Sequence, residues 1–371
     1  MAHIFKHPNK SNKGIIIFTH KELQLFNLKV NRRFIKNPFR ILTIHLVFIR
    51  NILKIRKKYF IGIHWGFFSK NQITPGWVDF HLSAPGTANF KENTNVFPLN
   101  SANFTPMVMN REFDQDRYWD LICVAKNDAK KKYPELLRSV RKLYDIDQNI
   151  RVLFVIASNK DENGNNKFYN EIFNDYNKMF SQKERELFTI IKTHPETGFQ
   201  GFSYTFLSYL YNRSKVFTIF SQIEGECRVV KEAQLCGLPV VVKSDVQGGI
   251  RDYLNESNSL LFDDYEDAHI ILKKAIDNYD KFKIDTEYWT KELREDYSLI
   301  RLKEYLDEFY NSKGIKFDGE LINTDNLNRR LPAHFYDIQT VPWASDSEFR
   351  FKTTDILNVY MLRSFLKKLK L

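Results

Sequence analysis

Two glutamates, Glu224 and Glu232, have the spacing best suited to chemistry in this sequence. Glu224 follows the apolar run Val216–Phe220, and Glu232 lies within the helical pattern of residues 226–236. At 1.5 Å per residue, a helix separates the two carboxylates by about 12 Å along its axis. Carboxylates so placed accept hydrogen bonds from hydroxyls at the two ends of an elongated ligand. A nucleotide-diphosphate sugar fits, with its sugar at one carboxylate and its ribose at the other.

The residues that join these glutamates suit a diphosphate. Gly225, Glu226 and Cys227 stand at the expected start of the helix, where backbone N–H groups have no partner within the helix and attract anions. A glycine at position 225 lets ligand and backbone approach closely. Arg228 adds a side-chain cation. We therefore expect a diphosphate to bind at this turn.

Alternating strands and helices must position these residues. Apolar runs predict strands at Gly14–Phe18, Tyr59–Ile63, Asp120–Ala125, Arg151–Ala157, Leu187–Ile191, Val216–Phe220 and Pro239–Val242. Helical patterns cover Tyr133–Tyr144, Phe168–Phe180, Tyr204–Asn212, Glu226–Cys236 and Ile300–Tyr310. From 118 to about 280 the alternation predicts a doubly wound parallel sheet, which binds ligands at the carboxyl ends of its strands.

The segment from Glu224 to Val241 resembles the signature of the retaining glycosyltransferases of family 4, the glycosyl transferases group 1. The matching residues are Glu224, Glu232, Ala233, Cys236, Gly237, Pro239, Val240 and Val241. The resemblance implies the GT-B fold, an α/β architecture of two Rossmann-like lobes facing a cleft, here with a reduced N-terminal lobe and a C-terminal extension. It also implies transfer of a sugar from a UDP- or GDP-linked donor with retention of configuration and without a metal or cofactor.

Further site residues follow from the same resemblance. Lys126 and Lys131 correspond to two cations that grip the donor diphosphate, where positive charge offsets the charge that develops on the leaving group. Gly248 and Gly249 resemble the family's glycine pair, which wraps the ligand. The other donor-binding residues expected are Gly225, Glu226, Cys227, Arg228 and Glu232.

Histidines are the least specific candidates in the sequence. His64, after the strand predicted at 59–63, is the proposed catalytic histidine of the first lobe, with His81 as an alternative. His194 follows another predicted strand and is expected to border the pocket for the base. For each of the three, a structural or exposed histidine is the competing interpretation.

The resemblance also suggests how the chain is divided. Pro98-Leu99-Asn100 and Phe104-Thr105-Pro106 look like the family's crossover between lobes, inside the stretch Thr87–Trp119, which has weak periodicity and is predicted to be a linker. We expect an acceptor-side lobe at 1–105, a nucleotide-sugar-binding lobe at 106–290, and a helix and extension at 291–371. The extension is predicted to return to the N-terminal lobe and complete it.

Positive charge is concentrated at the start of the chain. The net charge is +11, yet residues 1–60 hold 14 of the 56 basic residues and only one of the 45 acidic ones, so the remainder is slightly acidic. Residues 32–58 read as a basic amphipathic helix, and 356–371 repeat the pattern. Such helices bind anionic membrane surfaces. The alternatives are the solvated face of a core helix and nucleic acid, for which no recognised motif is present.

The composition disfavours several classes of protein, namely disulfide-rich, zinc-binding, membrane-spanning and secreted ones. Cys123, Cys227 and Cys236 have no paired spacing, which disfavours a disulfide scaffold and a zinc site. The longest apolar stretch, 41–49, is shorter than a membrane span, and no signal peptide is recognised. We therefore expect a cytoplasmic protein, peripheral on the membrane, with a glycan or lipid-linked acceptor.

Metal-dependent transfer and two other functions remain as alternatives. Metal-dependent transferases often carry an Asp-x-Asp triplet, but neither Asp114-Gln115-Asp116 nor Asp145-Ile146-Asp147 directly follows a predicted strand, so both are expected to be incidental surface acids. A sugar-nucleotide epimerase of the same two-lobed fold is one alternative function. The other is a catalytically silent, sugar-nucleotide-binding protein associated with a membrane.

Overall fold

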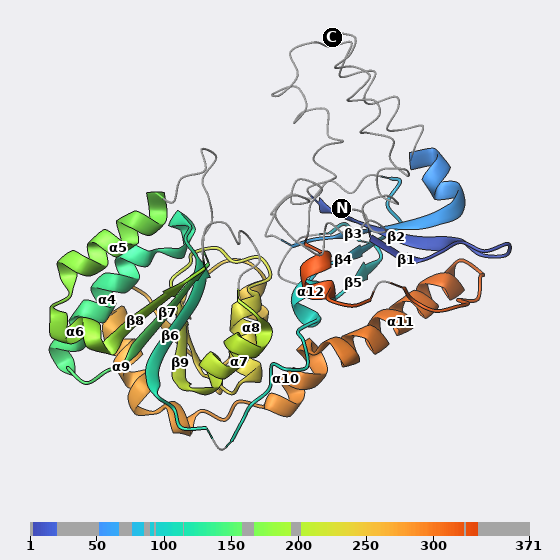
Figure 1. Ribbon diagram of the computed structural model, residues 1–371. Helices are drawn as coiled ribbons and strands as arrows, with labels where there is room; N and C mark the ends of the chain where they lie inside the picture. Colours follow the sequence, from blue (N-terminus) through green and yellow to red (C-terminus); the bar gives the residue numbers. More distant parts are fainter. Residues whose placement is uncertain are drawn as a thin grey trace, which may run out of the picture. The chain divides into compact units, whose positions relative to one another are not determined.

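The computed structural model describes residues 3–20, 52–66, 76–84, 90–92, 94–113, 115–157, 167–193, 202–322 and 324–332 (Figure 1). The chain divides into two compact units. The first unit comprises residues 1–104 and 298–371, and the second comprises residues 105–297. The first boundary lies beside the predicted one at 105, and the second unit ends seven residues beyond the predicted end at 290.

The first unit is built on a sheet whose described strands run in the order β1-β2-β3-β4-β5. Their bounds are β1 His3–Lys6, β2 Gly14–Thr19, β3 Tyr59–His64, β4 Phe80–Leu82 and β5 Val96–Phe97. The pair β1–β2 is antiparallel, and the other neighbours are parallel. Every residue of β2 is buried, which explains its continuous apolar run.

The chain after residue 297 packs onto this sheet. Helix α11 (Glu295–Ser312) places Leu302, Leu306 and Phe309 at helical spacing in one core with Phe60 and Phe80. The short helix α12 (Leu327–Arg330) contributes Leu327 to the same core. The described residues after 297 therefore belong to the first unit.

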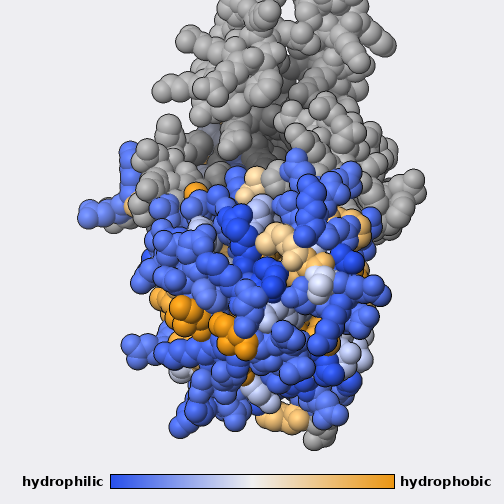
Figure 2. Space-filling model, turned by 90° about the vertical axis from the view of Figure 1, so that its left-hand side faces the viewer, coloured by the Kyte–Doolittle hydropathy of each residue, from blue (hydrophilic) through white to orange (hydrophobic). Residues whose placement is uncertain are grey.

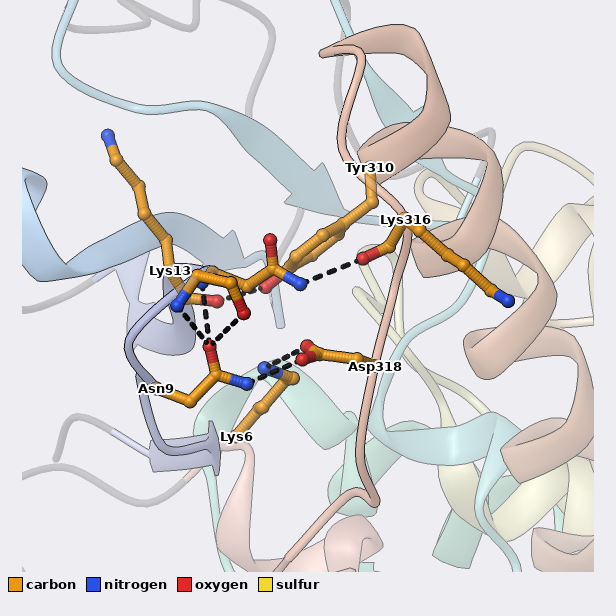
Figure 3. A network of polar contacts seen from close by, with 8 residues as sticks. Lys6, Asn9, Lys13, Tyr310, Lys316 and Asp318 are labelled. Atoms are coloured by element: carbon orange, nitrogen blue, oxygen red, sulfur yellow. Dashed lines mark hydrogen bonds and ion pairs between the residues drawn. The ribbon is translucent and has the colours of Figure 1, made fainter.

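Polar contacts reinforce this attachment at the β1–β2 turn (Figure 3). Asp318 forms an ion pair with the buried Lys6 at 3.0 Å and accepts a hydrogen bond from the Asn9 amide at 2.5 Å. Hydrogen bonds from Asn12, Lys6 and Asn9 lower the pKa of Asp318 to about 2. The Tyr310 hydroxyl donates to the Lys13 carbonyl at 2.6 Å. The segment after α11 is therefore held by charge as well as by apolar packing.

The second unit contains a parallel sheet of order β11-β10-β9-β6-β7-β8 among its described residues. The strands are β6 Trp119–Lys126, β7 Val152–Ala157, β8 Phe188–Lys192, β9 Ser214–Ile219, β10 Val240–Lys243 and β11 Ser259–Phe262. The helices are α4 Tyr133–Ile146, α5 Lys167–Met179, α6 Gln182–Leu187, α7 Tyr204–Asn212, α8 Arg228–Leu235, α9 Ala268–Asp277 and α10 Thr286–Leu293.

Helices cover both faces of this sheet (Figure 1). Alternate residues of β6 point to opposite sides: Leu121 and Cys123 join a core with α4 and α9, whereas Ile122 and Val124 join a core with α7 and α8. This two-sided burial is the doubly wound arrangement predicted from the sequence. The strand order changes direction between β6 and β9, which makes that pair the topological switch point.

The linker prediction for Thr87–Trp119 is partly wrong. Val96–Phe97 forms β5, and Ser101–Asn103 forms a 3₁₀ helix whose start is capped by the buried Asn100 side chain. A two-residue strand has no detectable period, and buried amides resemble loop residues in a sequence. The helix predicted over Glu226–Cys236 is shorter, because Cys227 has left-handed backbone angles and caps a helix that begins at Arg228.

The membrane prediction lies largely outside the described residues. Within the basic segment, only residues 52–58 are described; they are helical, with Ile52 and Ile55 buried and Leu53 exposed. The segment 356–371 is not among the described residues. Over the described ranges, no helix has both the length and the apolar composition to cross a bilayer. The face in Figure 2 is mostly hydrophilic, with hydrophobic residues gathered in small separate groups.

Candidate functional site

The predicted chemistry gathers at the switch point of the second unit. Lys126 is the last residue of β6, and the short 3₁₀ helix Ala129–Lys131 follows it. Glu224 follows β9, the strand that pairs with β6. Parallel strands end at one edge, so residues that are far apart in the sequence meet there. In open α/β sheets this is the position at which ligands bind.

Lys131 and Glu224 form an ion pair at this edge. Both side chains are largely shielded from water, with exposures of 18% and 10%. Burial acts to lower the pKa of Lys131, but the charge of Glu224, together with Cys227 and a hydrogen bond to Glu224, outweighs burial and raises this pKa. Lys131 therefore remains an ammonium ion at neutral pH. The pair presents a positive and a negative group side by side.

Glu232 is held in the buried part of α8. It is 4% exposed, and the hydroxyl of the fully buried Tyr211 donates a hydrogen bond to its Oε2 at 3.2 Å. Burial, and secondarily the carboxylate of Glu232, raise the pKa of Tyr211 well above its ordinary value. The phenol therefore stays protonated and donates permanently. This contact fixes one oxygen of Glu232.

Arg228 lies one helical turn before Glu232. Burial would lower its pKa, but Tyr204, Glu232 and Glu226 outweigh burial and raise it. Tyr204 acts through its charge and through a side-chain hydrogen bond. Arg228 therefore stays positively charged, four residues after the Glu224 turn in sequence and beside Tyr204, Glu232 and Glu226.

The loop after β10 joins the same site. The Glu224 N–H donates to the Gln247 carbonyl at 2.9 Å, and Ile223 and Gln247 form a parallel bridge. Gly248 follows with φ of 100°, a conformation that favours glycine. The structure thus brings Gly248, and with it Gly249, next to the Glu224 turn. Gly225 itself is half-buried within that turn.

Cys227 has φ of 41° and ψ of 58°, in the left-handed region that residues with a side chain seldom adopt. Its carbonyl accepts the N–H of Val230 at 3.1 Å and so closes the first turn of α8. Burial raises the pKa of its thiol well above the ordinary value, and Glu224 adds to the shift. Cys227 therefore shapes the turn and is not a nucleophile at neutral pH.

The histidine candidates that the structure describes, His64 and His81, lie in the first unit. His64 is at the carboxyl end of β3 in the first unit, fully buried, and its Nε2 accepts the Ser101 N–H at 3.1 Å. His81 is also buried, and its Nδ1 accepts a hydrogen bond from Trp65 Nε1 at 2.8 Å. Burial lowers the pKa of His81 to about 4. His194 lies outside the described residues.

The aspartates of the second Asp-x-Asp triplet, Asp145 and Asp147, form ion pairs with neighbouring side chains. Asp145 pairs with Arg141 at 2.7 Å, and Asp147 pairs with Lys273 at 3.6 Å. Asp116 is exposed, and Asp114 is not among the described residues. In the described part of the chain, no group of three or more His, Cys, Asp or Glu side chains is placed to hold a metal ion.

Sequence reasoning missed two contributors to the site. Tyr211 is one; the buried residues of α7 also include the polar Ser208 and Asn212, so its hydroxyl did not distinguish it in the sequence. Gln247 is the other, and it acts through its backbone carbonyl, so its residue type gives no signal.

The comparisons with known proteins concern mainly this unit. Residues 109–288 match the model of the family described as glycosyl transferases group 1. The predicted resemblance to this family is therefore confirmed for residues 109–288. No curated protein matches the sequence.

Solved structures show the fold. HepE from Anabaena, in complex with UDP, has 12% identity and a TM-score of 0.54, and the match covers 71% of this chain and 76% of that one. A UDP-forming α,α-trehalose-phosphate synthase from Burkholderia xenovorans has 13% identity and a TM-score of 0.51, with 72% of each chain covered. The predicted α/β fold of the GT-B type, with two Rossmann-like lobes, is confirmed.

Longer proteins are also among the matches. The pneumococcal O-GlcNAc transferase GtfA, in complex with UDP and GlcNAc, has 10% identity and a TM-score of 0.48, with 70% of this chain and 54% of that chain covered. This chain spans about half the length of the first solved structures that it matches.

Proposed function

We propose that this protein is a glycosyltransferase that moves a sugar from a nucleotide-diphosphate sugar to a glycan or lipid-linked acceptor. The observation that carries the proposal is the pairing of Lys131 with Glu224 at the switch point, inside the segment that matches the glycosyl transferases group 1. UDP in the solved relative HepE favours a UDP-linked donor; GDP is the alternative.

Each charged group then has one task. Glu224 accepts hydrogen bonds from hydroxyls of the donor sugar and orients it. Glu232, held by Tyr211, accepts hydrogen bonds from the ribose. Lys126, Lys131 and Arg228, with the backbone N–H groups at the start of α8, bind the diphosphate. When the bond between the anomeric carbon and the diphosphate oxygen breaks, these cations stabilise the charge that collects on the departing nucleotide.

The proposed stereochemical outcome is retention, supported by the resemblance to family 4. The proposal involves no metal, because the cations that face the diphosphate are side chains of the chain itself. The acceptor hydroxyl attacks the anomeric carbon as the bond from that carbon to the diphosphate oxygen breaks. Its proton passes to the departing diphosphate oxygen, and the nucleoside diphosphate leaves as the second product. The proposed location is the cytoplasmic face of a membrane, supported by the basic pattern of residues 32–58.

A binding panel followed by a turnover assay tests this proposal. UDP, GDP and their common sugar conjugates are added to the full-length protein, and the melting temperature is measured, because ligands that bind only the native state raise it. One nucleoside diphosphate and its sugar should stabilise the protein, and release of that diphosphate should depend on an added acceptor. Stabilisation without any turnover would favour the silent-binding alternative, and no stabilisation by any member of the panel would contradict the proposal.

A further inference from the structure

A second candidate site lies at the opposite edge of the sheet in the second unit. A cavity of about 260 Å³ is lined by residues before β11, within β11, at the end of α9 and after it. Its lining residues are Glu256, Ser257, Leu260, Lys274, Asn278, Lys281, Phe282 and Lys283. Leu260 is near the amino end of β11. The proposed donor site is at the carboxyl ends of β6 and β9, so the two sites are distinct.

The charge of the cavity is strongly positive for its size. Lys274, Lys281 and Lys283 all line it, and Glu256 is its one acidic residue. Among the described residues, none of the three ammonium groups has a carboxylate partner, although Lys281 donates to the Asn278 side chain at 2.7 Å. Neighbouring lysines outside the cavity are paired, since Lys273 contacts Asp277 and Lys291 contacts Glu287. The cavity therefore carries about two uncompensated positive charges.

The uncharged residues of the cavity indicate the size and polarity of the rest of the ligand. Leu260 and Phe282 are half-buried, and each packs against a core of the unit, so they form fixed apolar walls. Ser257 and Asn278 also line the cavity, and both are held in place, because the Ser257 hydroxyl donates to the Asn255 side chain and the Asn278 amide donates to the Lys274 carbonyl. Pockets for drug-sized ligands have volumes of about 300–1,000 Å³. At about 260 Å³, this cavity suits a molecule smaller than a nucleotide-diphosphate sugar.

We propose that this cavity binds a small phosphomonoester, with the phosphate at the three lysines and the carbon body against Leu260 and Phe282. A phosphomonoester carries a charge of about −1.5 to −2 at neutral pH, which matches the excess positive charge of the lining. The same group occurs in soluble metabolites and in the headgroup of phosphatidic acid. The binding is independent of the proposed donor site.

Calorimetric titration of the full-length protein tests this site. Phenyl phosphate and inorganic phosphate are the probes, each with and without saturating UDP. Phenyl phosphate should bind saturably, in the millimolar range or tighter, several-fold more tightly than inorganic phosphate, and UDP should not displace it. The variant Lys281→Gln with Lys283→Gln should weaken binding at least tenfold, and Phe282→Ala should bring phenyl phosphate to the affinity of inorganic phosphate.

A matched variant and a vesicle arm complete the design. Lys273→Gln with Lys291→Gln removes the same charge outside the cavity and should leave affinity within twofold of the wild type. Vesicles containing phosphatidic acid that compete with phenyl phosphate would assign the headgroup as the source, and vesicles that do not compete would assign a soluble phosphomonoester. Absence of saturable binding, displacement by UDP, or equal loss in both lysine variants would overturn the proposal.

Discussion

The two units place different chemistry at the carboxyl ends of similar parallel strands. In the second unit, Lys126, Lys131 and Glu224 make that edge charged. In the first unit, the corresponding ends of β2 and β3 lead into His20 and Trp65, which are buried and whose stacked rings have centroids 6.0 Å apart. We call this the aromatic edge. One edge has the charges that a diphosphate requires, and the other has imidazole and indole groups.

This difference shows that the fold sets where a site forms and the side chains set what it binds. In the second unit, helices cover both faces of the parallel sheet, and in such folds ligands bind at the carboxyl ends of the strands. The charged edge accounts for donor binding in the proposed reaction. At the aromatic edge of the first unit, His20 and Trp65 are buried against each other. The variants below test the two edges separately.

Loss of the carboxylate at the charged edge should have the largest effect. We expect Glu224→Gln to reduce kcat by about 10²–10³, because the substitution removes the charged acceptor for the donor sugar and leaves Lys131 without its partner. Release of the nucleoside diphosphate measures this. Glu287→Gln, at an exposed ion pair with Lys291, is the matched control and should retain full activity. Equal activity in both variants would remove Glu224 from the mechanism.

The stability of the first unit should depend on pH through His81, which accepts a hydrogen bond from Trp65 at the aromatic edge. Its folded pKa of about 4 lies below the ordinary 6.5, so the unfolded chain takes up the proton first as pH falls. The contribution of His81 to stability is therefore complete above pH 6.5 and is lost as pH falls towards 4, with about 2 kcal/mol lost by pH 5. Urea unfolding at pH 7 and pH 5 measures it.

The variant for this test is His81→Asn, compared with the wild type. His81→Asn should remove about 2 kcal/mol of the loss of stability between pH 7 and pH 5. If His81→Asn lost as much unfolding free energy between pH 7 and pH 5 as the wild type, another group would cause the pH dependence, and the aromatic edge would not be held by a neutral imidazole.

Tyr211→Phe sharpens the account of Glu232. Removing the hydroxyl frees one carboxylate oxygen from its fixed position, and we expect the donor KM to rise about fivefold with kcat within twofold, since one hydrogen bond contributes about 1 kcal/mol. Steady-state kinetics at varied donor concentration separate the two constants. Tyr176→Phe is the control, because that hydroxyl donates only to the Phe188 carbonyl among the described residues. A fall in kcat alone would place Tyr211 outside donor binding.

The smallest effect is expected at the Asp318 contacts of the first unit. Asp318 has a pKa of about 2 in the folded protein, below the ordinary 3.8, so its stabilising contribution is present above pH 3.8 and is lost as pH falls towards 2. Asp318→Asn should lower the melting temperature at pH 7 more than at pH 2.5, and should not change turnover. An equal decrease at both pH values would show that these contacts stabilise through shape and not through charge.

The sequence predicted most of the second unit and less of the first. Runs such as Val152–Ala157 are buried on both faces, so their apolar continuity is visible without a structure. The two residues of β5 have no such run, and Asn100 looks like a loop residue although it is a buried cap. Both site carboxylates were found from local spacing.

The partners of those carboxylates could not be predicted. Lys131 lies 93 positions from Glu224, and Tyr211 lies 21 positions from Glu232. Only the return of β9 beside β6 brings the first pair together, and single-sequence patterns do not encode which strands become neighbours. Lys130, Lys131 and Lys132 are consecutive, and the sequence does not show which of them contacts Glu224; the ion pair identifies Lys131.

The central claim is that the charged edge of the second unit binds a nucleotide-diphosphate sugar. A crystal structure with the nucleoside diphosphate that stabilises the protein most would test it directly. The account predicts the diphosphate beside Lys131 and the N-terminus of α8, with both ribose hydroxyls on Glu232. A nucleotide bound elsewhere, or one whose ribose does not touch Glu232, would contradict the account.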